Sequence, residues 1–165
     1  KEACKFVDEV YGCVIPEEAD LVIASCGGYP KDINVYQMQK TMDNAACAVK
    51  KGGVVILLAD CEEGSGSKLL EESFKRLKTP EAIKAELEKN FQIGANKAFA
   101  VSRPISRARF ILVTSLDREM ARTMLFTGAV DTVEEALEVA KPYLPEKPTI
   151  ILMPEGSLTV PRVEN

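Results

Sequence analysis

Short, uninterrupted runs of apolar residues recur along the chain and are separated by amphipathic stretches. Their length and their content of β-branched residues favour buried strands over helices. Four such runs cover residues 20–26, 54–59, 110–114 and 149–153. Because the runs are continuous rather than alternating, both faces of the sheet should be covered. The pattern therefore predicts an α/β fold: a three-layer Rossmann-like domain with a mostly parallel sheet of about four or five strands.

The segments between these runs carry apolar residues at steps of three and four, which is the spacing of an amphipathic helix. The longest predicted helix covers residues 33–50, with Asp32 as its N-cap and Gly52-Gly53 after its end. Thr79-Pro80 and Thr132 are further helix-start signals. Other helices are expected over residues 1–11, 68–77, 80–90, 96–102 and 118–125, and after residue 132.

Composition narrows the class of protein. A length of 165 residues suits one α/β domain, and the net charge of −4 argues against a nucleic-acid partner. No apolar run approaches the roughly 18 residues of a membrane span, so no membrane partner is expected. The five cysteines form no C-x-x-C pair and favour free thiols in a reducing, cytoplasmic setting. The chain contains no histidine, which excludes any mechanism that uses a histidine of this chain.

The end of the first predicted strand carries the most informative candidate site, because ligands of open α/β sheets bind where the strands end. Gly27-Gly28 would let a ligand approach the backbone closely. The next helix would offer free N–H groups and a positive dipole end to a carboxylate or phosphate. Tyr36, Gln37 and Lys40 lie within its first two turns and can share one patch. A phenol, an amide and an ammonium group there would suit a small anion.

Plainer explanations exist for each of these features. A lysine on a helix is usually a solvated surface residue, and Tyr36 could serve packing alone. The acidic cluster of Asp60, Glu62 and Glu63 could bind a metal or act as acid and base, or could simply be a solvated loop. A basic group could meet an anion or an acidic partner, or serve solubility; it consists of Arg103, Arg107 and Arg109.

Several segments resemble the lactate racemase family, a family of nickel-pincer nucleotide-dependent 2-hydroxyacid racemases and epimerases. Residues 27–40 (GGYPKDINVYQMQK) are similar to its G-G-Y-P-x-D-x-N-x-Y-Q-x-x-K segment, without a gap. Residues 60–66 (DCEEGSG) resemble its E-C-x-E-G-x-G loop. Residues 91–94 with Lys97-Ala98 look like its Q-x-G-x-H-K-A segment, and Met153-Pro154 with Gly156 its M-P-H-G-G segment.

The resemblance implies that residues 1–165 are the C-terminal domain of a longer two-domain enzyme. Such an enzyme racemises or epimerises a 2-hydroxy acid by hydride transfer to and from a nickel-pincer nucleotide. The N-terminal domain would hold this cofactor and all the catalytic groups, so no catalytic residue, metal ligand or cofactor is expected in this chain, and the isolated chain should be inactive.

By the same resemblance, Gln37 and Lys40 would hold the substrate carboxylate or hydroxyl, and Tyr36 would line the pocket. Further pocket-lining residues would be Gly27, Gly28, Tyr29 and Phe99, with Phe99 in place of a family tryptophan. Asn96 and Glu155 stand where the family often has histidine, so the substrate could be larger or more polar than lactate.

Two other functions compete with this one. The absence of histidine also fits a non-catalytic α/β ligand-binding or regulatory domain for a small organic anion. A nicotinamide-dependent dehydrogenase is disfavoured, because the chain lacks both the G-x-G-x-x-G fingerprint and a histidine acid or base.

Overall fold

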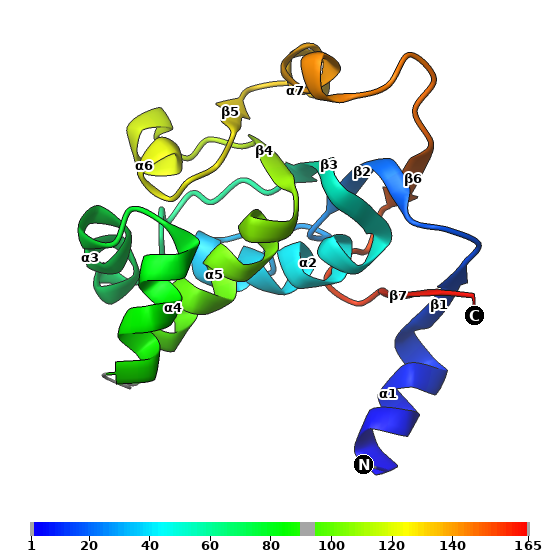
Figure 1. Cartoon of the computed structure of the whole chain (residues 1–165), viewed down its shortest axis with the longest axis horizontal. Helices are drawn as coiled ribbons and strands as arrows, with labels where there is room; N and C mark the ends of the chain where they lie inside the picture. Colours follow the sequence, from blue (N-terminus) through cyan, green and yellow to red (C-terminus); the bar gives the residue numbers. More distant parts are fainter. Residues whose placement is uncertain (1, 90–94, 165) are drawn as a thin grey trace.

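A parallel sheet forms the centre of the computed structural model, which describes residues 2–89 and 95–164 (Figure 1). The five strands lie in the order β5-β4-β3-β2-β6, and all neighbouring pairs are parallel. From β2 the chain adds strands outward to β5 and then returns to place β6 on the other side of β2, so the strand order reverses between β2 and β6. The strands are β2 (Ala19–Ser25), β3 (Val49–Leu58), β4 (Arg109–Val113), β5 (Gly128–Val130) and β6 (Ile150–Met153).

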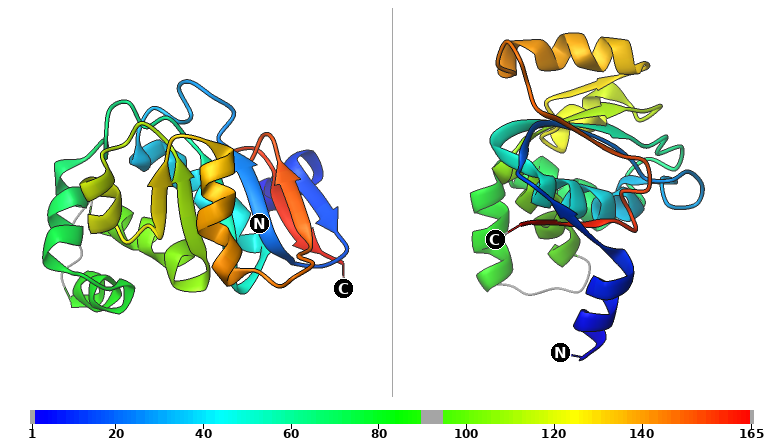
Figure 2. Two further views of the ribbon diagram at one scale, coloured as in Figure 1. Left: turned by 90° about the horizontal axis from the view of Figure 1, so that it is seen from above. Right: turned by 90° about the vertical axis from the view of Figure 1, so that its right-hand side faces the viewer.

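Helices cover both faces of this sheet, which confirms the predicted α/β fold class (Figure 2). On one face lie α2 (Val35–Ala48) and α5 (Ala95–Arg107), and α3 (Lys68–Arg76) and α4 (Pro80–Lys89) pack beside α5. On the other face lie α7 (Val133–Ala140) and the short 3-10 helix η1 (Lys141–Tyr143), while α6 (Arg118–Thr123) leads into β5. No helix among the described residues is long and apolar enough to cross a membrane.

The strand residues alternate between two hydrophobic cores. Val55, Leu57 and Phe110 are fully buried on the face of α2 and α5. Val54 and Ile56 are fully buried on the face of α7. Because each face needs apolar side chains, the strands read as continuous apolar runs in the sequence.

A second, two-stranded parallel sheet joins segments near both ends of the described chain. It pairs β1 (Gly12–Ile15) with β7 (Val160–Val163), and α1 (Glu2–Tyr11) precedes it. Figure 1 shows α1 extending away from the main sheet, and its Phe6 and Val10 side chains are largely exposed. The sequence did not predict this sheet, because three of the four β1 residues are exposed and carry no buried-strand pattern.

Several predicted boundaries were wrong. Asn34, and not Asp32, is the N-cap of α2. Gly52-Gly53 lie inside β3, which begins at Val49 directly after the helix. Helix α5 continues through Pro104 to Arg107, well beyond the predicted end at residue 102. The helix starts at Thr79 and Thr132 are confirmed, since their hydroxyl oxygens accept hydrogen bonds from the N–H groups of Ala82 and Glu135.

The Asp20 side chain connects the beginnings of β2, β3 and β6 through hydrogen bonds and an ion pair. Its carboxylate accepts hydrogen bonds from the Thr149 N–H group at 2.9 Å and the Thr149 hydroxyl at 2.8 Å, and its other oxygen contacts Lys50 Nζ at 3.0 Å. The backbone hydrogen bond from Thr149 and the bond from Lys50 lower the pKa of Asp20 to about 2. The carboxylate form is thus stabilised specifically in the folded chain.

Replacing Asp20 by asparagine is expected to destabilise the protein at neutral pH, and the loss should shrink in acid. An unfolded aspartate has a pKa of about 3.9, so the stabilisation is complete above about pH 5 and is lost as the pH falls toward 2. Denaturant titrations of wild type and Asp20→Asn between pH 7 and pH 2 measure this difference. A gap in unfolding free energy that stays constant over that range would contradict the assignment.

Candidate functional site

The start of α2 is held by the acidic, glycine-bearing loop that follows β3. The Asn34 side-chain oxygen accepts a hydrogen bond from the Gln37 N–H group at 3.0 Å, and its amide donates to Glu63 at 3.3 Å. Gly66 has φ +71° and packs against Asn34, so that a Cβ at residue 66 would lie 2.5 Å from the Asn34 side chain. The two motifs over residues 27–40 and 60–66 are therefore parts of one structural unit.

The first N–H groups of α2 are not free. The Val35 N–H donates to the Gly64 carbonyl at 3.0 Å, and the Tyr36 N–H donates to the Ser65 carbonyl at 3.1 Å. Since Asn34 also occupies the Gln37 N–H, the expectation of free N–H groups for a carboxylate was wrong. An anion bound near this helix must be held by side chains.

Side chains from α2 and α5 form a partly exposed group that we call the α2 patch. It consists of Tyr36, Gln37, Lys40 and Lys97. Lys40 Nζ donates to Gln37 Oε1 at 2.8 Å. From α5, Lys97 Nζ lies 4.2 Å from the centre of the Tyr36 ring. The structure thus brings together Tyr36, Gln37 and Lys40, which the sequence predicted, and adds Lys97, to which sequence reasoning gave no role.

The α2 patch carries two positive charges. Within residues 2–89 and 95–164, no carboxylate lies within ion-pair distance of Lys40 or Lys97. Burial lowers the pKa of Lys97 first, and the nearby charge of Lys40 lowers it further, against an opposing effect of Asp43. A site with two unneutralised ammonium groups is suited to an anion.

Gly27 and Gly28 differ in what surrounds them. A Cβ at Gly27 would clash with the Glu155 carboxylate and the Lys31 ammonium, which form an ion pair at 3.0 Å. The close approach expected there for a ligand is therefore made by this ion pair, which also neutralises Glu155. Gly28 has no atom within 4 Å of its Cβ position, and Tyr29 is 74% exposed, so this side of the loop is open.

Phe99 lies apart from the α2 patch. It is half-buried and lines a hollow of about 240 Å³ together with Pro80 and Lys84 of α4. Lys97, two residues earlier on α5, instead contacts α2. The structure therefore does not bring Phe99 to the predicted pocket. Asn96 is exposed on α5, and the preceding motif residues 91–94 lie outside the described residues.

The crevice between β2 and β6, where the strand order reverses, is filled by the segment after β6. The Gly156 N–H donates to the Ser25 carbonyl at 2.9 Å, and the Ser157 hydroxyl donates to the Cys26 carbonyl at 2.9 Å. The Asn44 side chain of α2 donates to the Gly156 carbonyl at 2.8 Å. Since the chain itself occupies the usual ligand position of such folds, the partly exposed α2 patch is the stronger candidate site.

The acidic loop does not form a metal centre in the described part of the chain, where no three acidic, cysteine or histidine residues gather closely enough. The Asp60 carboxylate instead accepts a hydrogen bond from the Ser115 hydroxyl at 2.6 Å.

Two cysteines near the strand ends are buried, and burial raises the pKa of Cys26 to about 11 and that of Cys61 to about 12. Both thiols are therefore protonated at neutral pH and are poor metal ligands and nucleophiles.

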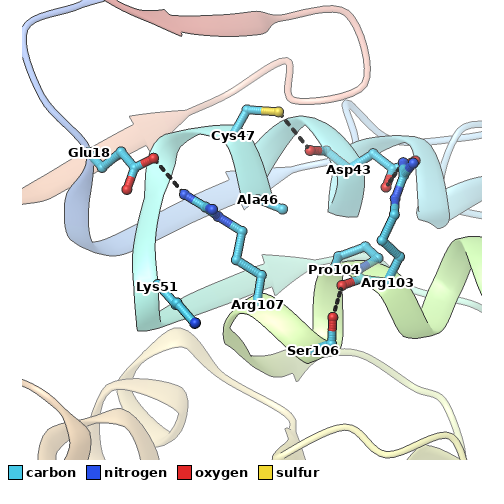
Figure 3. A pocket seen from close by; sticks show the side chains of 9 residues that line it. All are labelled: Glu18, Asp43, Ala46, Cys47, Lys51, Arg103, Pro104, Ser106 and Arg107. Carbon is cyan, nitrogen blue, oxygen red and sulfur yellow. Dashed lines mark hydrogen bonds and ion pairs between the residues drawn. The ribbon is translucent and has the colours of Figure 1, made fainter. Parts of the chain in front are cut away.

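The predicted arginine group is largely neutralised. Arg103 and Arg107 line a hollow of about 900 Å³ beside the second half of α2. Figure 3 shows how their side chains lie there. Arg103 pairs with Asp43 at 2.8 Å, and Arg107 pairs with Glu18 at 2.5 Å. Arg109 donates to the Gly52 carbonyl at 2.5 Å. These arginines therefore have internal partners and hold elements of the fold together.

The fold and the patch define a class: a parallel α/β domain whose first covering helix presents cationic and amide side chains near the strand ends. The family model for the lactate racemase C-terminal domain matches residues 14–160. The chain therefore belongs to the lactate racemase C-terminal domain family.

Similar proteins that are named lactate racemase support this family assignment. The chain is 32% identical over 169 residues to a lactate racemase of Thermoanaerobacterium thermosaccharolyticum, covering 98% of this chain and 38% of the relative. It is 39% identical over 66 residues to a lactate racemase of Lactiplantibacillus plantarum, covering 40% of this chain and 15% of the relative. The solved lactate racemase apoprotein from T. thermosaccharolyticum superposes with a TM-score of 0.88 at 31% identity, covering 98% of this chain and 39% of that one.

Proposed function

We propose that this chain is the substrate-binding C-terminal domain of a lactate racemase-like enzyme that inverts C2 of a 2-hydroxy acid. The observation that carries the proposal is that the Lys40 ammonium group has no counter-charge among the described residues. Its ammonium group is exposed and bonded to the neutral Gln37 amide, and it has no carboxylate partner within the part of the chain that the structure describes. A substrate carboxylate would supply the missing counter-charge.

Each residue of the α2 patch has a role in this proposal. The Lys40 ammonium would pair with the substrate carboxylate. Because Gln37 Oε1 accepts from Lys40, its NH₂ group is oriented away from that bond and can donate to the carboxylate or the 2-hydroxyl. Tyr36, whose side chain is partly exposed, would cover one side of the bound acid.

The residues of this chain do not fit the metal of a nickel-pincer nucleotide. The sequence has no histidine, the described residues include no three-ligand cluster, and the two buried thiols near the strand ends are protonated. We therefore assign that cofactor and the groups that act on C2 to an N-terminal domain of the full-length protein. The chain spans 38% of the length of its T. thermosaccharolyticum relative, which leaves ample room for such a domain.

The cysteines bear on where the protein works. Free thiols at Cys13, Cys26, Cys47 and Cys61 support a cytoplasmic setting.

A chiral assay of the cofactor-loaded, full-length protein tests this function. Single enantiomers of a panel of 2-hydroxy acids are incubated with it and separated by chiral chromatography. We expect at least one acid to reach a mixture of both configurations, and we expect no turnover by the isolated chain under the same conditions. No inversion of any acid, with nickel shown to be bound, would contradict the proposal and favour a binding domain for an organic anion.

A further inference from the structure

We propose that Gln39 is a positioning residue, which fixes the Lys97 ammonium group against the Tyr36 ring and so holds that ring in one orientation. The inference rests on the proposed function, in which Tyr36 lines the substrate pocket. It gives a role to a buried amide of α2. Residue 39 is one of the positions that the family-like segment over residues 27–40 leaves open.

The amide of Gln39 is satisfied in only one orientation. Its Oε1 atom accepts a hydrogen bond from Lys97 Nζ at 2.7 Å, and its Nε2 atom donates to the Asp43 carboxylate one turn later on α2. An ammonium group only donates and a carboxylate only accepts, so turning the amide around would break both bonds. Asp43 is fixed in turn by Arg103 of α5 at 2.8 Å. A polar chain thus crosses the interface of the two helices and ends at Lys97.

The bond from Gln39 holds the Lys97 charge over the Tyr36 ring. Lys97 Nζ lies 4.2 Å from the ring centre, which is within the range of a cation–π contact. The Tyr36 side chain is 39% exposed, so the surface of α2 alone leaves it room to turn. Lys97 restrains the ring from the side of α5, and the orientation of Tyr36 therefore depends on where Lys97 is held.

Asp43 offers Lys97 a competing partner. Burial and the charge of Lys40 lower the pKa of Lys97 and Asp43 opposes them, so Asp43 is close enough for its charge to act on Lys97. Residues 36 and 43 are two turns apart, about 10 Å along the helix axis, so one ammonium group cannot contact both side chains. Gln39 bonds to both Lys97 and Asp43. Without its amide, we expect Lys97 to shift toward Asp43 and to leave the Tyr36 ring.

Packing alone does not require an amide at residue 39. Gln39 is only 6% exposed, and the neighbouring core residues Val35, Met38 and Met42 of α2 are apolar and fully buried. An apolar residue would fill the same space without needing partners, whereas a buried amide is costly unless both of its bonds form. Whenever α2 packs on α5, the amide therefore has to bond to Lys97, and the Tyr36 ring is oriented before any substrate binds.

A double-mutant cycle in the cofactor-loaded full-length protein tests this role. Gln39→Met and Lys97→Met should each lower kcat/KM for the acid identified in the chiral assay by about 3- to 10-fold, because a loosely held ring orients the substrate less well. The two losses should not add, so the double variant should be no slower than the slower single variant. Ile83→Val, a core substitution in α4, is the control for a small loss of stability and should leave kcat/KM unchanged.

An NMR signal reports the position of Lys97 independently of turnover. The ring current shifts protons over an aromatic ring upfield, so the ε-methylene signal of Lys97 in ¹³C-lysine-labelled protein should lie upfield of those of exposed lysines. Lys97→Met identifies the signal. We expect Gln39→Met to remove the upfield shift. Gln39→Glu, whose carboxylate still accepts a hydrogen bond from Lys97, should keep the shift and should keep kcat/KM within about threefold of wild type.

Three outcomes separate the inference from its alternatives. An upfield signal that persists in Gln39→Met, or losses that add in the double variant, would overturn it, because Gln39 would then not act through Lys97. A lost shift with wild-type kcat/KM would show that the orientation of Tyr36 does not affect the reaction, which also overturns it. If wild type inverts no acid, the proposed function fails, and the shift in the two Gln39 variants still decides whether Gln39 holds Lys97 against Tyr36.

Discussion

Replacing Lys40 by methionine in the full-length protein is expected to lower kcat/KM for its 2-hydroxy acid by about 100- to 1000-fold. Methionine keeps the length and the apolar stem of the side chain but removes the charge that would pair with the substrate carboxylate. Losing one partner of a charge pair inside a closed site costs about 2–5 kcal/mol, and a misplaced substrate reacts more slowly. Steady-state kinetics with the acid identified in the chiral assay measure the change.

The stability of the Lys40 variant provides the control. Lys40 is exposed and its bond to Gln37 lies on the surface, so its removal should change the free energy of unfolding by about 0.5 kcal/mol or less. Lys51→Met, an exposed lysine of β3, is the matched substitution and should leave turnover unchanged. Wild-type turnover in Lys40→Met would remove Lys40 from the site.

Replacing Gly66 by alanine should destabilise the protein by about 2–3 kcal/mol, although the residue is exposed. A residue with a Cβ at φ +71° costs about 1–2 kcal/mol in the left-handed region. The added Cβ would also displace the Asn34 side chain, and loss of an N-cap costs about 1 kcal/mol. Because Asn34 fixes the start of α2, turnover of the full-length protein should fall as well.

Gly52→Ala separates the two causes. Gly52 has φ +81°, but nothing lies within 4 Å of its Cβ position, so the cost there is backbone strain alone, about 1–2 kcal/mol. Denaturant unfolding of both variants gives the comparison. If Gly52→Ala and Gly66→Ala are equally destabilised and equally active, the contact between Gly66 and Asn34 contributes nothing to the site.

The sequence predicts the central sheet well because local pattern and tertiary environment agree there. The runs over β2, β3, β4 and β6 are apolar on both faces, and the folded sheet buries both faces of the first three. It misses β5 because that strand has only three residues, all half-buried. It also misses the pairing of β1 with β7, which depends on two segments at opposite ends of the described chain.

In the candidate site, too, the sequence predicts the contacts within one helix and misses those that depend on distant segments. Tyr36, Gln37 and Lys40 share a helix, so their spacing alone predicts that they meet. The partners of the first α2 N–H groups come from Gly64 and Ser65, and no local pattern reveals that these carbonyls occupy them. Lys97 reaches α2 from α5 through the fold. The only signal for it in the sequence is its place in the family-like segment that ends in Lys97-Ala98.

The most direct test is a crystal structure of the full-length protein with a bound 2-hydroxy acid. The account predicts a carboxylate oxygen about 2.7–3.2 Å from Lys40 Nζ, with the Gln37 NH₂ group donating to the same acid and the Tyr36 ring against it. A 2-hydroxy acid bound in the closed site with its carboxylate held elsewhere, and Lys40 still bonded only to Gln37, would contradict the central claim that the α2 patch binds the substrate.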